Sequence, residues 1–156
     1  MKAETGENII KNIEFRDISR EDIHTLAQME QVIFSDSWSE NAILESMERD
    51  YMHFYGAYKG DVLVGYLIFS HIVDELEIFR IAVECDCRGY GIAQVFIRKL
   101  QEFGREAGEA RILLDVRESN LAARNLYVKT GFVEDGRRKH FYDKPQEDAI
   151  LMSFAF

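Results

Sequence analysis

A short glycine-containing segment near the middle of the chain has the residue types and spacing of a phosphate-binding loop. Residues 88–93 read Arg-Gly-Tyr-Gly-Ile-Ala, between a β-type apolar run over 77–83 and a helical apolar pattern that starts at Ile92. The first N–H groups of a helix have no intrahelical acceptor and lie at the positive end of its dipole, so an anion can bind there. The glycines would let a pyrophosphate approach these amides, and Arg88 supplies a positive charge.

The loop alone does not identify its ligand. No Gly-Lys-Ser/Thr sequence follows it and the spacing G-x-G-x-x-G is absent, so it is neither a Walker loop nor a dinucleotide-binding loop. Glycine at a strand-to-helix turn also occurs for steric reasons alone. Other residues must therefore indicate what binds.

Asp115 and Tyr127 are the next candidates for chemistry. Asp115 interrupts an apolar strand-like run over 112–116, and period-two alternation puts it on one face with Arg117. It could be functional, or it could pair with Arg117 or with a helix N-terminus. Tyr127 falls in a predicted helix over 120–130, where a tyrosine is more often a core side chain whose hydroxyl finds a partner.

The elements that must position these residues can be read from the apolar periodicity and the turn residues. The pattern predicts strands over 13–18, 53–58, 62–71, 75–83, 111–117, 132–137 and 148–154, and helices over 19–34, 37–49, 91–107 and 120–130. Lys59-Gly60-Asp61 is typical of a hairpin connection, and Ser37 with Glu40 has capping-box spacing. The order β-α-α-β-β-β-α-β-α-β-β indicates a largely antiparallel sheet followed by one β-α-β-α unit.

Length and composition favour one cytoplasmic domain. The 156 residues suit a short flexible lead over 1–12 and a single domain over 13–156. A net charge of -9 argues against nucleic acid as a partner, because that affinity depends on Lys and Arg. The lead has no apolar block that would make a signal peptide or an anchor, and the longest apolar run, 62–69, is too short to span a membrane.

The two cysteines do not indicate a metal site. Cys85 and Cys87 have no third cysteine and no nearby histidine, so we expect neither bound metal nor a disulfide framework. A reactive thiol at Cys87, activated by the neighbouring Arg88, is the minor alternative.

Several motifs occur together in one order. They are R-I-A-V at 80–83, the loop with Arg88, Gly91 and Ala93 in the pattern [RQ]-x-x-G-x-[GA], R-E-S-N-L-A-A-R-N-L-Y-V-K-T-G-F at 117–132, Trp38-Ser39-Glu40, and a tail with Arg-Arg-Lys at 137–139, Tyr142 and Glu-Asp-Ala at 147–149. Over roughly residues 13 to 153, this set resembles the GNAT superfamily of acetyl-CoA-dependent N-acetyltransferases, and within it the ribosomal-protein-alanine N-acetyltransferases (RimI type).

The resemblance implies an α/β (α+β) single domain of GNAT type. Its mixed, mostly antiparallel central sheet would have six to seven strands flanked by about four helices. The backbone of Ile81, Ala82 and Val83 would bind the pantetheine arm of acetyl-CoA. Arg88 and Asn120 would face the same co-substrate, whose pyrophosphate would lie on the amides of Gly89, Tyr90, Gly91, Ile92, Ala93 and Gln94.

The resemblance also implies roles in catalysis. Asp115, where the family usually has glutamate, would take the proton of the attacking amine directly or through water, or Glu77 would do so instead. Tyr127 would protonate the leaving thiolate. Phe34, Trp38 and Tyr142 would contact the acceptor.

The expected acceptor is the N-terminal alanine of a small-subunit ribosomal protein, acetylated by a monomer or weak homodimer without nucleic acid, membrane or metal. Two alternatives remain open. One is acetylation of a small amine such as a polyamine or amino sugar, because the substrate half of the fold varies between members. The other is a non-catalytic acyl-CoA-binding module.

Overall fold

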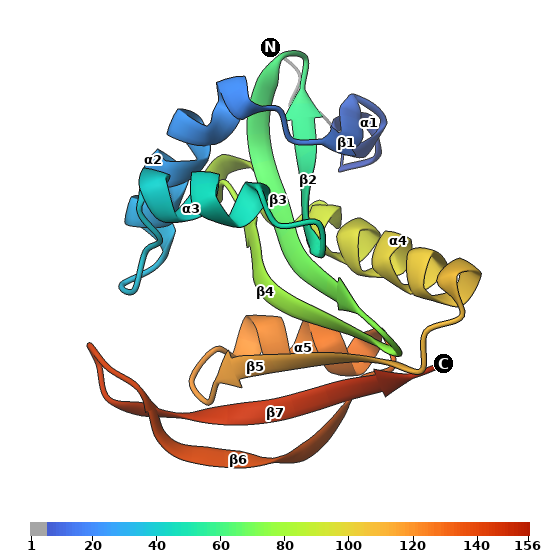
Figure 1. Cartoon of the computed structure of the whole chain (residues 1–156). Coiled ribbons are helices and arrows are strands. Elements are labelled where there is room, and N and C mark those ends of the chain that lie inside the picture. The colour runs from blue at the N-terminus through green and yellow to red at the C-terminus, as the bar shows by residue number, and fades with distance from the viewer. Residues whose placement is uncertain (1–5) are drawn as a thin grey trace.

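The strands form one sheet of seven in the order β1-β2-β3-β4-β5-β7-β6 (Figure 1). The computed structural model describes residues 6–156. Its strands are β1 (Ile13–Asp17), β2 (Met52–Lys59), β3 (Val62–Ile72), β4 (Glu75–Val83), β5 (Arg111–Arg117), β6 (Val133–Tyr142) and β7 (Glu147–Ala155). Its α-helices are α1 (Gly6–Lys11), α2 (Ile23–Ile33), α3 (Glu40–Met47), α4 (Ile92–Ala107) and α5 (Leu121–Lys129).

The predicted order of elements and the mixed, mostly antiparallel sheet are confirmed. β4 and β5 pair in parallel, and the other neighbouring strands are antiparallel. The helix over Gly6–Lys11 was not predicted, and it occupies the segment expected to be a flexible lead. Residues 1–5 of that lead lie outside the described residues.

Two local boundaries differ from the predictions. Helix α3 is capped by Ser39, whose hydroxyl accepts from the Ala42 amide at 3.1 Å, and not by Ser37. The reason is tertiary, because the Trp38 amide donates to the Glu30 carboxylate and so holds this part of the chain outside the helix. Strand β6 runs five residues past 137, since register shifts let its pairing with β7 continue to Tyr142.

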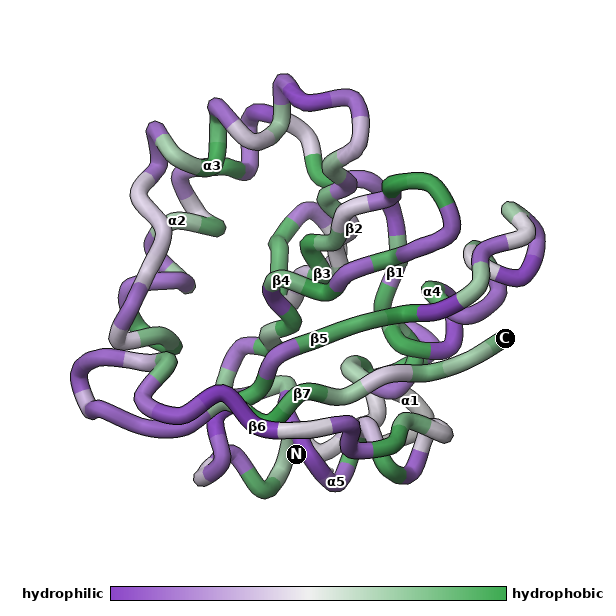
Figure 2. The backbone as a smooth tube through the Cα atoms, turned by 60° about the horizontal axis from the view of Figure 1, so that its bottom comes forward, coloured by the Kyte–Doolittle hydropathy of each residue, from purple (hydrophilic) through white to green (hydrophobic). Residues whose placement is uncertain are grey.

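The sheet has a separate apolar cluster on each face. One cluster contains Phe96, Ile97 and Leu100 of α4 with Tyr127 of α5, and the other contains residues of α2 and Ile43 of α3. Strand β3 is buried along most of its length because helices cover both of its faces. Strand β6 is at an edge of the sheet and is mostly hydrophilic, whereas β5 and β7 carry hydrophobic runs (Figure 2).

The strands β4 and β5 separate partway along their length. Their register begins at Glu75 opposite Arg111 and ends at Ile78 opposite Leu114. On the other side of β4, the register with β3 shifts at Ile68 and Phe69, which is a β-bulge. Beyond Ile78, β4 therefore diverges from β5. The backbone groups of β4 on the edge that faces β5 have no strand partner there.

No helix within residues 6–156 is long and apolar enough to cross a membrane.

Candidate active site

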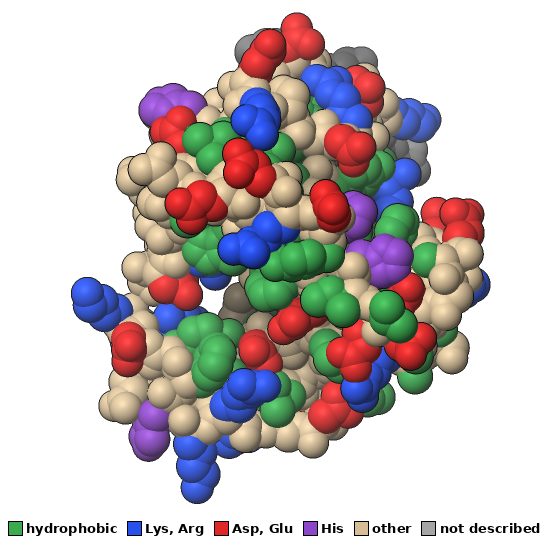
Figure 3. All heavy atoms as spheres, viewed as in Figure 1, with side chains coloured by type: hydrophobic (Ala, Val, Ile, Leu, Met, Phe, Trp, Pro, Cys, Tyr) green, Lys and Arg blue, Asp and Glu red, His purple; other side chains and the backbone are tan. Residues whose placement is uncertain are grey.

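A cavity of about 940 Å³ lies where β4 and β5 separate. The end of β4, the end of β5, the start of α4 and the inner side of α5 form most of its wall. The connection between α2 and α3 and the turn between β6 and β7 complete it. In the space-filling view the surface is hollowed between the α2–α3 part and the β6–β7 part (Figure 3).

The predicted phosphate loop borders this cavity. Gly91 is the N-cap of α4 with φ +88°, and Gly89 has φ +86°, backbone conformations that residues with a side chain rarely adopt. A Cβ at either position would meet no protein atom within 4 Å, so the space in front of the loop is open. The first bond of the helix runs from the Val95 amide to the Gly91 carbonyl, which leaves the amides before Val95 without an intrahelical acceptor. The loop therefore fits an anionic group such as a pyrophosphate.

The residues predicted to bind the co-substrate mostly line the cavity together. They are Ile81, Ala82, Val83, Arg88, Gly89, Gly91, Ile92, Ala93, Gln94 and Asn120. Tyr90 is not among the lining residues. The side chain of Arg88 turns back to β4, where its Nε donates to the Val83 carbonyl at 2.8 Å.

The two candidate carboxylates are neighbours but are placed differently. Asp115 lines the cavity, whereas Glu77 does not. Glu77 is opposite Leu113 in the parallel register, on the face that alternation assigns to Asp115. Burial, and then the negative charges of Asp115 and Glu75, raise the pKa of Glu77. The arrangement makes Asp115 the carboxylate that a ligand in the cavity can reach.

Tyr127 lies on the inner side of α5 and lines the cavity with only 4 % of its surface exposed. Its ring packs against that of Phe132 at 5.4 Å between centroids. Burial, and to a smaller extent Tyr142, raise the pKa of the Tyr127 hydroxyl above its ordinary value. The hydroxyl is therefore protonated at neutral pH.

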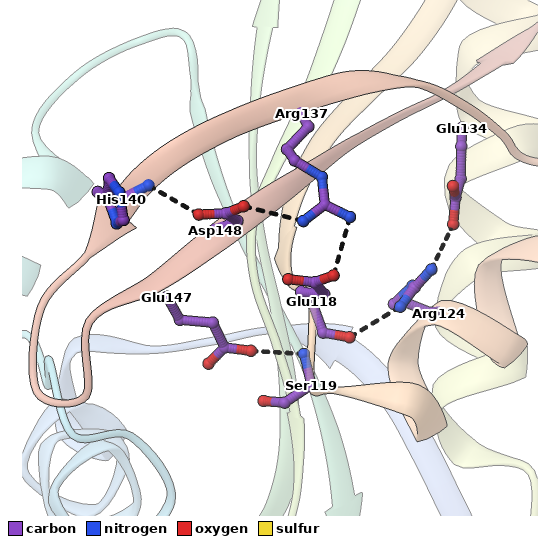
Figure 4. A network of polar contacts seen from close by, with 8 residues as sticks. All are labelled: Glu118, Ser119, Arg124, Glu134, Arg137, His140, Glu147 and Asp148. Carbon is purple, nitrogen blue, oxygen red and sulfur yellow. Dashed lines mark hydrogen bonds and ion pairs between the residues drawn. The ribbon is translucent and has the colours of Figure 1, made fainter.

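The start of α5 is capped, and polar contacts hold the turn that precedes it (Figure 4). The Asn120 side chain caps the helix by accepting from the Ala123 amide at 3.2 Å. Just before it, the Ser119 amide donates to Glu147 of β7. The side chain of Ser119, and then this backbone bond, lower the pKa of Glu147, and Arg117 adds to the effect.

A second set of contacts ties the same turn to the edge of the sheet (Figure 4). Arg137 of β6 bonds both Glu118 and Asp148 at 2.8 Å, and the bond from Arg137 is the largest cause of the lowered pKa of Asp148. Arg124 of α5 donates to the Glu118 carbonyl at 2.8 Å and to Glu134 of β6 at 2.6 Å. The network fixes α5, and therefore Tyr127, relative to β5.

The aromatic residues predicted to contact an acceptor divide into two groups. Phe34 and Tyr142 line the cavity from opposite segments, the α2–α3 connection and the end of β6. Trp38 is not a lining residue; it packs against the cluster under α2 and α3. Burial and the charge of Asp115 raise the pKa of Tyr142 to about 12.

Sequence reasoning missed Glu30, which organises the α2–α3 connection. Its buried carboxylate accepts from the Trp38 amide at 3.0 Å, from Arg80 Nε at 3.1 Å and from the Tyr66 hydroxyl. Arg80 in turn stacks its guanidinium carbon 4.1 Å from the ring centroid of Phe34. A signal was present, since Glu30 is the charged residue on the apolar face formed by Ile23, Leu26 and Ala27.

Cys87 does not have the environment of a reactive thiol. It lines the cavity but is buried, and burial followed by the Glu84 carboxylate raises its pKa. The alternative of an activated Cys87 is therefore disfavoured. Within residues 6–156, no group of three or more His, Cys, Asp or Glu side chains could hold a metal ion.

Comparison with known proteins identifies the family. The model of the acetyltransferase (GNAT) family matches residues 20–132. A Bacillus subtilis protein named a putative ribosomal protein bS18-alanine N-acetyltransferase is 31 % identical over 138 residues, 88 % of this chain and 91 % of that protein. The Haemophilus influenzae protein of the same name, without "putative", is 32 % identical over 149 residues, 94 % of this chain and 97 % of that protein.

A solved structure agrees. The ribosomal-protein-S18-alanine N-acetyltransferase from Escherichia coli superposes with a TM-score of 0.85 at 26 % identity, covering 92 % of this chain and 93 % of that one. The family match spans most of the sequence that forms the cavity, from the helix before the α2–α3 connection to the end of α5. This chain belongs to the GNAT family of acetyltransferases.

Proposed function

We propose that this protein transfers the acetyl group of acetyl-CoA to the N-terminal α-amine of a protein. The acceptor that its relatives favour is the N-terminal alanine of a small-subunit ribosomal protein, because the proteins at 31 % and 32 % identity are named for that reaction. Such an acceptor would be met in the cytoplasm.

One observation carries the proposal. A single cavity connects the open amides at the start of α4, the Asp115 carboxylate, the Tyr127 hydroxyl and two segments that bear Phe34 and Tyr142. Direct transfer between two bound substrates needs these parts together: an anion site, a proton acceptor, a proton donor and a place for the amine.

The co-substrate would bind along the β4 side. Its pyrophosphate fits the amides of 89–94, with Arg88 and Asn120 beside them. The pantetheine arm would add to the edge that β4 leaves unpaired over Ile81–Val83, as an extra strand would. Acetyl-CoA supplies the thioester that the amine attacks.

The reaction then requires two proton transfers and stabilisation of the negative charge that develops on the oxyanion. An α-amine with a pKa of about 8 is mostly protonated at neutral pH and must lose a proton before it can attack. Asp115 accepts this proton through a water molecule, and burial together with the charge of Asp115 raises the pKa of Glu77 beside it. A backbone N–H of residues 81–83 stabilises the oxyanion, and Tyr127 protonates the leaving thiolate.

The test is product analysis. An Ala-initiated ribosomal peptide should gain one acetyl group at its α-amine, as seen by mass spectrometry with fragmentation. The same peptide with a blocked N-terminus should gain none. Acetylation only of polyamines or amino sugars in a parallel panel would overturn the proposed acceptor, and tight binding of coenzyme A with no turnover of any amine would overturn the proposed reaction.

A further inference from the structure

Arg117 is in contact with both segments that form the acceptor side of the cavity. It follows Asp115 by two residues on β5, and its side chain is 20 % exposed. One terminal nitrogen donates to the Pro145 carbonyl at 3.1 Å and to Glu147 at 3.3 Å. The other donates to the Asp143 carbonyl at 3.1 Å and to the Ser35 hydroxyl at 3.4 Å.

The guanidinium also supports an aromatic residue of the cavity wall. Its central carbon lies 4.3 Å from the ring centroid of Tyr142, a cation–π contact. Tyr142 ends β6 and lines the cavity. Arg117 therefore holds the β6–β7 turn through two carbonyls, one carboxylate and one ring.

The two segments face each other across a hollow. A second cavity of about 420 Å³ is lined by Ser35 and Asp36 from one segment and by residues 141–144 from the other. Arg117 reaches both segments from the sheet beneath. Arg117 forms an ion pair with Glu147. It does not pair with Asp115, the pairing that the sequence had left open.

The two walls are secured differently. The α2–α3 connection has its own anchor, since Arg80 donates to the Asp36 carbonyl at 2.8 Å and to Glu30. Of the four hydrogen bonds of Arg117, three go to the β6–β7 side and one, the longest, goes to Ser35. Loss of Arg117 should therefore release the β6–β7 turn first and widen the gap between the walls.

We infer that Arg117 is a positioning residue, which holds the α2–α3 connection and the β6–β7 turn at the separation that a polypeptide acceptor requires. The inference rests on the proposed function, because it deepens the role of the same site. This role requires the planar guanidinium group. A guanidinium presents fixed donors to several acceptors at once, whereas an ammonium is a point charge. Lysine should not replace arginine here.

The experiment compares three variants with the wild type. Arg117→Gln and Arg117→Lys remove the planar contact. Arg111→Gln is the matched control, since Arg111 is an exposed arginine on the same strand, paired with Glu75 and absent from the cavity wall. We expect both Arg117 variants to raise the KM for the acceptor peptide by about tenfold or more, the scale of lost charged hydrogen bonds. The KM for acetyl-CoA should stay within about twofold of the wild-type value, because the proposed anion site is formed by the start of α4, which Arg117 does not contact through any of its hydrogen bonds.

A second measurement needs no acceptor. Amide hydrogen exchange of the free protein should be faster over 34–36 and 142–146 in Arg117→Gln than in Arg111→Gln, and similar over β3. An unchanged peptide KM together with unchanged exchange would overturn the inference, as would full rescue by Arg117→Lys. If the wild type acetylates no peptide, the proposed function fails, and hydrogen exchange still decides whether Arg117 holds the two walls.

Discussion

Arg80 Nε lies 3.1 Å from the carboxylate of Glu30, and this ion pair joins β4 to α2 inside the protein. The Glu30 side chain is fully buried and that of Arg80 is 10 % exposed. Burying charges is costly unless they are paired and hydrogen-bonded, and here the Tyr66 hydroxyl and the Trp38 amide complete the shell of the carboxylate. The pair holds Phe34 at the cavity wall, because Arg80 stacks on its ring.

Replacing Glu30 by glutamine should lower the free energy of unfolding by about 3 kcal/mol, since it removes the buried counter-charge of Arg80 and leaves only the half-exposed carboxylate of Asp36, 3.5 Å away. Urea denaturation measures the change. Glu48→Gln is the control, because Glu48 is an exposed partner of Arg20 at 3.8 Å and should change stability by less than about 0.5 kcal/mol. Equal effects of the two substitutions would contradict the importance of the buried pair.

Gly91→Ala should weaken acetyl-CoA binding specifically. Gly91 has φ +88° and Gly60, in the β2–β3 turn, has φ +61°, and a Cβ would meet open space at both. Alanine at either position should therefore cost about 1–2 kcal/mol of stability through backbone strain. Calorimetry should show at least a tenfold loss of affinity for acetyl-CoA in Gly91→Ala and no change in Gly60→Ala. Equal affinity for acetyl-CoA in both variants would show that the loop is not part of the co-substrate site.

Tyr127→Phe should lower kcat by roughly 10²-fold, the usual scale for loss of a general acid, with little change in either KM. The ring stays in the core, so the melting temperature should be nearly unchanged. Tyr51→Phe, at an exposed tyrosine between α3 and β2, is the control and should leave kcat unaltered. A kcat near the wild-type value in Tyr127→Phe would assign the proton to another donor.

Asp115→Asn should reduce kcat by about 10²-fold or more in steady-state kinetics. Glu77→Gln should cost less than about tenfold, because Glu77 does not line the cavity. The charge of Asp115 helps to raise the pKa of Glu77, so Asp115→Asn should lower the pKa of the Glu77 carboxyl, as measured by NMR titration of that side chain. If Glu77→Gln is the more damaging variant, the roles are reversed.

The patterns that sequence reasoning used successfully are local. Apolar periodicity located the strands and the four long helices, and glycine at positions 89 and 91 marked the strand-to-helix loop. The helix predicted over 120–130 is present as α5, and the side chain of Asn120 caps it. Each of these signals depends on residues that are close together in the sequence. Over such short separations, backbone sterics and side-chain capping decide the conformation.

The errors arose where distant segments meet. Ser37 had the right spacing to cap α3, but the Trp38 amide is taken by Glu30, eight residues earlier, and Ser39 caps instead. The contact of Trp38 with the acceptor stays a prediction; in the structure Trp38 packs under α2 and α3 and does not line the cavity. The end of β6 was underestimated because its pairing with β7 passes through register shifts that no local pattern shows.

The amino-acid sequence by itself determined the order of the strands and of the helices α2 to α5, the glycine-containing loop before α4 and the family, because these depend on spacing along the chain. Tertiary structure alone decided that Asp115, and not Glu77, lines the cavity, that Glu30 and Arg80 anchor one wall, and that Arg117 reaches the other. The physical reason is that these outcomes depend on where β4 and β5 stop pairing and on contacts between residues 50 to 82 positions apart, such as Glu30 with Arg80 and Ser35 with Arg117.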